Sequence, residues 1–351
     1  MPLARTYSVA LIGVTGHVVE IEADIANGLP AVIVVGLPDT ALREARDRIR
    51  AAITNSREEW PQRKITVGLS PASLPKRGSW FDLAIAIGIL AAAGKVPRAA
   101  AARVMFFGEL GLDGRLRPVR GVLPAVARAA EEGFGKVMVA EQNAAEAALV
   151  PGVRVIAVNS LTRAADWLRG LSGPDGQPAA VEYQGGQDLP GRAGRNGKLA
   201  SGGGAQAAGR GSAMAPDLAE LLGQSMARRA AEVCAAGGHH LSLLGPPGAG
   251  KTMLAERIPT ILPRLDRAAA FEVTAVHSVA GTLPAQVPLL EDPPFLAPHH
   301  TATKAAIVGG GSGVIRPGSA SLAHRGVLFL DEATEGVGTH QAAGASAVRC
   351  H

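Results

Sequence analysis

The stretch LSLLGPPGAGKT at residues 241–252 decides the fold of the second half of the chain. An apolar strand, Leu241–Leu244, leads directly into a glycine-rich loop, and a helix is expected to begin at Lys251. Glycines let the backbone curl until its N–H groups point inward at phosphate oxygens. The stretch matches the Walker A pattern in full and in the strand–loop–helix context that the pattern requires. We therefore predict a P-loop α/β domain.

Each residue of this loop has an expected role. The cradle for the phosphates of ATP is expected from the loop backbone, and Lys251 is expected to reach the β- and γ-phosphates. Thr252 is expected to ligate Mg²⁺. The residues predicted to bind nucleotide are Gly245, Pro246, Pro247, Gly248, Ala249, Gly250, Lys251 and Thr252.

A second motif, VLFLDE at residues 327–332, has the form of a Walker B strand. Four apolar residues predict a buried strand, and two acids follow at its carboxyl end, where ligands bind in open α/β sheets. Asp331 is expected to hold Mg²⁺ through water. Glu332 and Lys251 are the candidate catalytic residues. The Glu332 carboxylate is expected to orient and deprotonate the attacking water.

Four short segments surround these motifs: GGH at residues 237–239, APHHT at 297–301, VGGG at 308–311 and SLAH at 321–324. With them, residues 1 to about 332 resemble the magnesium-chelatase-like AAA+ proteins of the ComM/YifB family. The resemblance implies an ATP-driven homo-hexameric motor in the cytoplasm, acting on single-stranded or branched DNA during branch migration. Leu296 departs from the arginine that the family usually carries before APHH.

Residues 1–170 alternate strand and helix signals, and the resemblance implies a Lon-protease-like (ribosomal-protein-like) α+β domain. By alignment with Lon-type proteases, Trp80 stands at the nucleophile position and Leu123 at the lysine position, so we expect no protease activity. Ser79 as a displaced nucleophile is the alternative. Strands are predicted at 18–25, 31–35, 64–69, 104–110, 136–140 and 154–158, and helices at 40–53, 83–93, 122–132 and 161–168.

The composition changes after residue 170. Residues 171–212 are expected to form a flexible linker, because Gly, Ala and Ser dominate from residue 185 onward. The basic residues of this linker either contact nucleic acid or are simply solvated. Residues 213–332 are expected to form a partial AAA+ core, with a helix or helix pair at 217–235 that breaks at Gly223-Gln224.

An Ala- and Gly-rich tail at 333–351 is expected to be aberrant, and 19 residues follow Glu332. The family resemblance implies a sensor strand, an arginine finger and a helical lid after this point. The sensor strand should lie between the two motif strands, so its loss is expected to leave strand edges unpaired. We expect a frameshift or premature stop near Ala333; a genuine divergent tail is the alternative.

Composition limits the remaining possibilities. The formal charge of +5 tolerates a polyanion partner but is also an ordinary basic surface. Cys234 and Cys350 form no paired spacing, which fits a reducing cytosol. The longest apolar run, 83–94, is too short for a membrane span, which needs about 20 residues. The pairs His239-His240 and His299-His300 lack acidic or Cys partners at a metal-site spacing, so hydrogen bonding is expected of them.

Three functions therefore remain open. The chain is an ATP-hydrolysing motor on DNA, a nucleotide-binding protein that cannot hydrolyse ATP, or a non-enzymatic remnant whose N-terminal domain binds a partner. The motor is the leading interpretation. The second function is considered because loss of an arginine finger alone can lower the hydrolysis rate by about 10³–10⁵.

Overall fold

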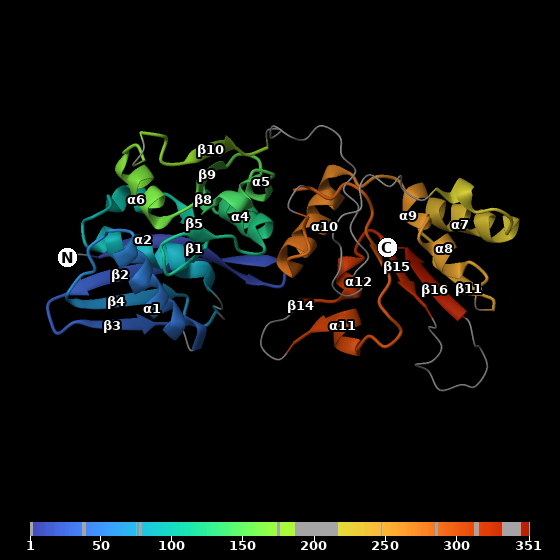
Figure 1. Cartoon of the computed structure of the whole chain (residues 1–351), viewed down its shortest axis with the longest axis horizontal. Helices are drawn as coiled ribbons and strands as arrows, with labels where there is room; N and C mark the ends of the chain where they lie inside the picture. The colour runs from blue at the N-terminus through green and yellow to red at the C-terminus, as the bar shows by residue number, and fades with distance from the viewer. Residues whose placement is uncertain are drawn as a thin grey trace. The chain divides into compact units, whose positions relative to one another are not determined.

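The chain divides into two compact units, Met1–Gly194 and Arg195–His351, which are described one at a time. Figure 1 labels the elements of both units in a computed structural model. The structure describes residues 3–36, 40–74, 76, 79–173, 176–186, 217–246, 248–284, 287–311, 316–331 and 345–350. Both units mix helices with sheet, so the chain is of the mixed α/β class.

The first unit is built on an eight-stranded mixed sheet with the order β10-β9-β8-β5-β1-β2-β4-β3 (Figure 1). The long hairpin of β1 and β2 lies inside the sheet, where β5, β8 and β9 continue it in parallel and β4 pairs antiparallel to β2. The strands are β1 (Ala4–Ile12), β2 (Thr15–Ala26), β3 (Ala31–Val35), β4 (Lys64–Ser70), β5 (Met105–Phe106), β8 (Lys136–Ala140), β9 (Arg154–Val158) and β10 (Val181–Gln184). A separate two-stranded ladder joins β6 (Glu109–Leu110) to β7 (Leu116–Arg117).

Helices cover both faces of this sheet. On one face Thr6 donates a hydrogen bond to the carbonyl of Ala84 in α2, and the buried side chains of α1, α2 and α6 share one core. On the other face Gly16 of β2 lies against Arg128 of α4. The main helices are α1 (Thr40–Asn55), α2 (Asp82–Ala92), α4 (Val122–Glu131) and α6 (Leu161–Arg169), with short turns at η1 (Ser79–Phe81), α3 (Arg98–Ala101), η2 (Glu141–Asn143) and α5 (Ala144–Ala147).

The predicted elements of the first unit are confirmed with two differences. The strand expected over 104–110 is two short strands, β5 and β6, in different sheets. The strand β1 was not predicted, although it lies in the middle of the sheet. Its buried polar residues Thr6 and Ser8 interrupt the apolar pattern. Each has a hydrogen-bond partner, because Thr6 donates to the carbonyl of Ala84 and Ser8 to the carbonyl of Phe106.

The segment predicted as the start of a linker contains a strand. Within residues 171–212, β10 pairs antiparallel with β9 along Val181–Gln184, and Trp167 donates a hydrogen bond to Glu182 at 2.8 Å. The described part of this segment, through residue 186, therefore belongs to the first unit rather than to a linker. The remainder of the predicted linker, 187–212, lies outside the described residues.

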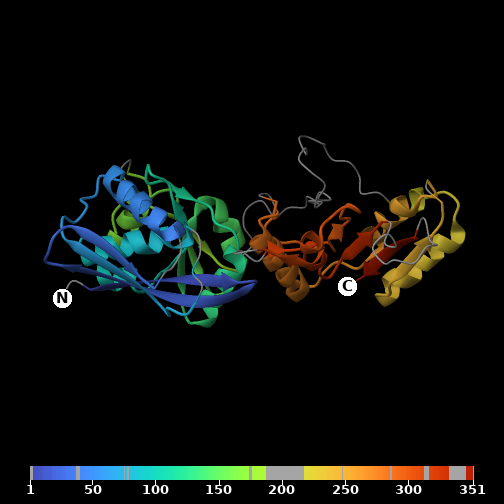
Figure 2. The ribbon, with the colours of Figure 1, turned by 90° about the horizontal axis from the view of Figure 1, so that it is seen from below.

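The second unit has a four-stranded sheet with the order β11-β16-β15-β12. Figure 1 labels β11, β16 and β15, and Figure 2 shows the red strands of this sheet from below. The strands are β11 (Leu241–Leu244), β16 (Ala345–Cys350), β15 (Val327–Leu330) and β12 (Phe295–Leu296). The strands β11, β15 and β12 share one direction, because β11 and β15 each run antiparallel to β16 and β12 is parallel to β15.

Both predicted helical segments of the second unit, at 217–235 and from Lys251, are present. The break expected at Gly223-Gln224 separates η3 from α7, and both break residues have a positive φ. Side chains of η3, α7, α8 and α9 pack on one face of the sheet around Phe329. The elements outside the sheet are η3 (Leu218–Glu220), α7 (Ser225–Gly237), α8 (Lys251–Ala255), α9 (Ile258–Ile261), α10 (Arg267–Ala280), α11 (Lys304–Val308) and α12 (Ser319–Leu322), with a small ladder of β13 (Gly309–Gly310) and β14 (Arg316–Pro317).

The expectation of unpaired edges between the two motif strands is wrong. The strand β16, from the tail expected to be aberrant, pairs with β11 on one side and with β15 on the other. The tail's high Ala and Gly content hid this strand, because few large side chains mark it. Residues 332–344 of the chain, including most of the predicted tail, lie outside the described residues.

Candidate functional site

The glycine-rich loop follows β11 without an intervening residue, and α8 begins at Lys251 as predicted. Gly248 and Gly250 have φ of +79° and +80°, in the left-handed region that other residues rarely adopt. The N–H of Ala249 donates to the carbonyl of Pro246 at 3.2 Å, which closes a tight turn inside the loop. Pro247 lies outside the described residues. The loop therefore has the curled backbone that a phosphate cradle needs.

The lysine of the loop is held by the loop itself. Lys251 Nζ donates to the carbonyl oxygens of Gly245 at 2.7 Å and Pro246 at 3.3 Å. These neutral acceptors hold the ammonium group beside the curled backbone, where an incoming anion could compete for it. Thr252 is the next residue of α8 and is exposed.

The acidic end of β15 lies at the same sheet edge as the loop. Leu244 is paired with Ala345 and Leu330 with Ala347, both on β16. Because β11 and β15 run in one direction, their carboxyl ends, which lead to Gly245 and Asp331, lie at one edge of the sheet. The structure thus brings the loop 245–252 and Asp331 to a common edge. Glu332 lies outside the described residues.

Gln224 is a residue of this region that the sequence did not reveal. Its Nε2 donates to the carbonyl of Ala249 within the loop, and a Cβ atom at Gly250 would lie 3.4 Å from the same nitrogen. Gln224 itself has a positive φ of 47° at the start of α7. The helix break at Gly223-Gln224 was a visible signal, but it indicated a turn and not a contact with a loop 25 residues away.

The histidine pairs do not gather a metal-ligand set within the described part of the chain. No group of three His, Cys, Asp or Glu residues that could hold a metal ion occurs among the described residues. The rings of His299 and His300 are tilted by 33° with their centroids 4.0 Å apart, and His299 Nδ1 contacts Thr301 Oγ1 at 2.8 Å. His239 packs back against Gly237, where a Cβ atom would lie 2.4 Å from its ring.

A histidine outside these pairs, His277, links α10 to α12. It is buried, its Nε2 lies 2.9 Å from the carbonyl oxygen of Leu322, and its Nδ1 lies 2.8 Å from Thr282 Oγ1. A carbonyl only accepts, so we assign the proton to Nε2, and Nδ1 accepts from the threonine hydroxyl. Burial lowers the pKa of His277, because it disfavours the imidazolium form.

The positions aligned with the protease dyad carry packing residues. Trp80 meets the ring of Phe107 edge-on at 5.8 Å between centroids, and Leu123 is buried in α4. Ser79 donates a hydrogen bond to a carboxylate oxygen of Glu109. The nearby Lys76 is buried and donates to backbone carbonyls, including those of Gly36 and Pro71.

The described hydrogen bonds of Ser79 and Lys76 go to different partners. A Ser–Lys dyad needs the amine beside the hydroxyl, yet among the described contacts Ser79 is bonded to an acid and Lys76 to carbonyls. Burial lowers the pKa of Lys76, and its ammonium group bonds to the carbonyls of Pro71 and Leu74 in the segment after β4.

An ion pair with a fully buried carboxylate joins Arg48 to Asp82 in the first unit. Arg48 of α1 donates to both oxygens of Asp82, at 2.9 and 3.2 Å, and the N–H of Leu110 donates to Asp82 at 3.3 Å. The Asp82 side chain is fully buried. Burial raises its pKa to about 6, and the hydrogen bond from Arg48 opposes that rise. The pair joins α1 to the first residue of α2 and lies in the first unit, whereas the glycine-rich loop belongs to the second.

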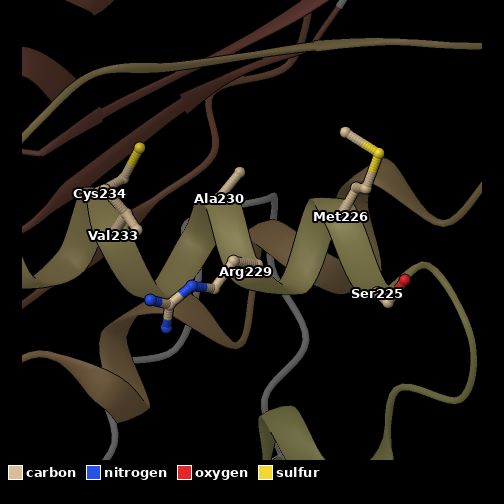
Figure 3. A pocket seen from close by; sticks show the side chains of 6 residues that line it. All are labelled: Ser225, Met226, Arg229, Ala230, Val233 and Cys234. Atoms are coloured by element: carbon tan, nitrogen blue, oxygen red, sulfur yellow. The ribbon is translucent and has the colours of Figure 1, made fainter.

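An apolar hollow on α7 is separate from the loop. Its lining comes from α7 alone, and Figure 3 shows Met226, Ala230 and Cys234 along one side of the helix. Met226 is 87% exposed. The hollow contains none of the predicted site residues. Its lining residues are Ser225, Met226, Arg229, Ala230, Val233 and Cys234.

Two family models match the chain. One, described as magnesium chelatase, subunit ChlI, matches residues 217–340, which include the glycine-rich loop and Asp331. The other, described as subunit ChlI of Mg-chelatase, matches residues 21–143 of the first unit. Both units are therefore covered, each by its own model.

Full-length relatives match across both units. Competence protein ComM of Haemophilus influenzae is 40% identical over 95% of this chain and 61% of its own length. The chain belongs to the ComM/YifB family of magnesium-chelatase-like proteins. Protein YifB of Escherichia coli is 38% identical over 95% of the chain and 60% of its own length. An uncharacterised protein of Mycobacterium tuberculosis is 50% identical over 95% of the chain and 61% of its own length.

The chain spans about 61% of the length of the relatives it matches, so the activity of the whole relatives does not transfer directly. Among the described helices of this ComM/YifB-family chain, none is long and apolar enough to cross a membrane.

Proposed function

We propose that the second unit binds ATP with Mg²⁺ at the sheet edge where the loop 245–252 and Asp331 meet. The observation that carries the proposal is the placement of Lys251 directly after two left-handed glycines and at the carboxyl end of β11. The curled loop offers backbone N–H groups to phosphate oxygens, and the parallel strand β15 ends in a carboxylate at that edge.

The donor set fits a magnesium nucleotide. Mg²⁺ prefers oxygen ligands and retains waters, which suits the Thr252 hydroxyl and a water-mediated contact to Asp331. When bound, the ion would neutralise charge on the phosphate oxygens. Lys251 Nζ would exchange the neutral carbonyls of Gly245 and Pro246 for phosphate oxygens, because a charged acceptor makes the stronger hydrogen bond. Glu332 is proposed as the general base.

Binding is tested with the purified chain and a fluorescent ATP analogue in the presence of Mg²⁺. Lys251→Ala should weaken affinity by about 10- to 100-fold, because a hydrogen bond to a charged group is worth about 1.5–3 kcal/mol. Lys304→Ala, an exposed lysine on α11, is the matched control and should change affinity less than about twofold. Equal affinity in Lys251→Ala and the unaltered chain would refute the proposed site.

The wider proposal is a DNA motor of the ComM type, acting as a homo-hexamer in the cytoplasm on single-stranded or branched DNA. It is supported by the similarity to a competence protein and by the basic charge of the chain. The first unit would then be a Lon-protease-like domain without protease activity, serving as a scaffold or DNA contact. If this is right, DNA should raise ATP turnover, and DNA binding should weaken steeply with salt.

Turnover separates this motor from the other two functions. ATP hydrolysis that disappears in Lys251→Ala supports the motor. Nucleotide binding without hydrolysis identifies a nucleotide-binding protein that cannot complete the reaction. No nucleotide binding, together with a folded first unit that still binds a partner, identifies the non-enzymatic remnant.

A further inference from the structure

The strand β16 is the physical link between the two strands that carry the candidate site. In the order β11-β16-β15-β12, β11 and β15 are not neighbours. The strand β16 pairs with β11 from Leu241↔Val348 to Leu244↔Ala345. It pairs with β15 from Val327↔Cys350 to Leu330↔Ala347. Within the described sheet, every ladder that connects the glycine-rich loop to Asp331 therefore passes through β16.

The register of β16 sets the stagger between the loop and the acid. Leu244 and Leu330, the last residues of their strands, are paired with positions on β16 that are two residues apart. A slip of one residue on either side would move Gly245 relative to Asp331 by about 3.3 Å. A displacement of this size is larger than the tolerance of a metal–phosphate site, where ligand distances vary by only a few tenths of an ångström.

Val348 holds this register. It is 1% exposed and belongs to the same core as Leu243 and Phe329. Its Cα partners are Leu241 on one side and Phe329 on the other. Successive residues of a strand point to opposite faces, so a one-residue slip would carry Val348 out of this core.

We propose that β16 is a positioning strand for nucleotide binding: residues 345–350 hold β11 and β15 at the spacing and stagger that the site requires. The proposal rests on the proposed function, because it concerns the affinity of the same site. The backbone hydrogen bonds of β16 are of the kind that an added strand can supply from another chain. A chain that ends before β16 should therefore accept a separate peptide strand of the same register between β11 and β15.

The register is tested without nucleotide. Val327→Cys should form a disulfide with the natural Cys350, since directly opposed residues of antiparallel strands bring their Cβ atoms within bonding range. Cys234→Ala removes the other cysteine. Leu328→Cys is the matched control, because its Cα partner is Arg349 and not Cys350. Oxidation and peptide mapping should give the Val327→Cys bridge alone; its absence would overturn the placement of β16.

The effect on the site is tested by MgATP affinity. Val348→Asp and a chain ending at residue 344 should each bind at least about tenfold more weakly than the full chain, whereas Val348→Ile should stay within about twofold. A synthetic peptide of residues 345–350 should restore binding to the shortened chain in a saturable way. The same peptide with Val348→Asp should not. Restored affinity cannot come from a chain that is simply unfolded.

The outcomes separate the two proposals. If the shortened chain binds MgATP as tightly as the full chain, β16 is not a positioning strand, although the nucleotide site stands. If the full chain binds no MgATP while the Val327→Cys bridge forms, the nucleotide site is refuted, and with it the role of β16 in binding. Lower affinity of the shortened chain with rescue by the peptide supports both.

Discussion

The eight-stranded sheet of the first unit and the four-stranded sheet of the second differ in how completely they are covered. In the first unit both faces are packed, so that Thr6 and Val9, on opposite faces of β1, are each fully buried. In the second unit Leu243 is 9% exposed while the next residue, Leu244, is 75% exposed. The sheet of the first unit is therefore buried on both faces. The candidate nucleotide site belongs to the smaller sheet of the second unit, where Leu244 is largely exposed.

The polar groups of the two units differ in the same way. The first unit encloses an ion pair, Arg48–Asp82, that is satisfied within the unit. In the second unit Lys251 is only partly buried and is held by carbonyls of its own loop. A group needed for stability is enclosed, while a group proposed to bind a ligand stays within reach of solvent.

The largest expected effect tests the packed unit. Asp82→Ala should lower the free energy of unfolding of the first unit by about 3–5 kcal/mol, because it leaves Arg48 partly buried without its counter-ion. All three tryptophans, Trp60, Trp80 and Trp167, lie in the first unit, so tryptophan fluorescence in a urea titration measures that unit alone.

The control for this change is an exposed ion pair of the same unit, Arg5–Glu22, which joins β1 to β2. Glu22→Gln should change stability by less than about 1 kcal/mol, since exposed pairs contribute little. Equal decreases in the free energy of unfolding for Asp82→Ala and Glu22→Gln would show that the buried pair stabilises the unit no more than the exposed pair.

The next effect is the pH dependence of the first unit. The pKa of Asp82 is raised to about 6 in the folded chain from an ordinary value of 3.8. Between these values the folded state binds a proton that the unfolded state has lost, so stability falls as pH rises from about 4 to 6. The fall from this group should be on the order of 3 kcal/mol at most. Asp82→Asn should remove it, as urea titrations across this range would reveal.

The second unit should respond to pH in the opposite direction. Burial lowers the pKa of His277, so the unfolded state gains a proton before the folded state does as pH falls through the ordinary histidine range. Stability from this group is therefore present above about pH 6.5 and is lost on acidification. Far-UV circular dichroism should show the unfolding transition of the second unit, which tryptophan fluorescence does not report. The urea midpoint of this transition should fall in acid. His277→Gln should reduce this acid sensitivity; an unchanged response would contradict the assignment.

The smallest effect tests the loop itself. Gly248→Ala and Gly250→Ala should each lower the free energy of unfolding of the second unit by about 1–2 kcal/mol, because both positions have a left-handed φ. A Cβ atom meets nothing within 4 Å at Gly248 but lies 3.4 Å from Gln224 at Gly250. Any excess loss in Gly250→Ala, measured by thermal unfolding and by MgATP affinity, therefore reports the Gln224 contact. Restoration by Gln224→Ala in the double variant would confirm that origin.

Local signals predicted much of both units. Periodicity placed α1, α2 and α4, and the apolar runs placed β11 and β15 at their observed bounds. The glycine-rich loop was predictable because its special backbone requires glycine at specific positions. These features depend on residues that are close together in the chain, and side-chain type records them directly.

The sequence by itself determined the strand–loop–helix around Lys251, the acidic end of β15 and the family. Only the tertiary structure decided that β1, with its buried Thr6 and Ser8, runs through the middle of a sheet, and that β10 extends the same sheet. It also decided that β16 joins β11 to β15 and that Gln224 contacts the loop. Strand pairing uses backbone groups that every residue carries, so the choice of a distant partner leaves little trace in side-chain pattern.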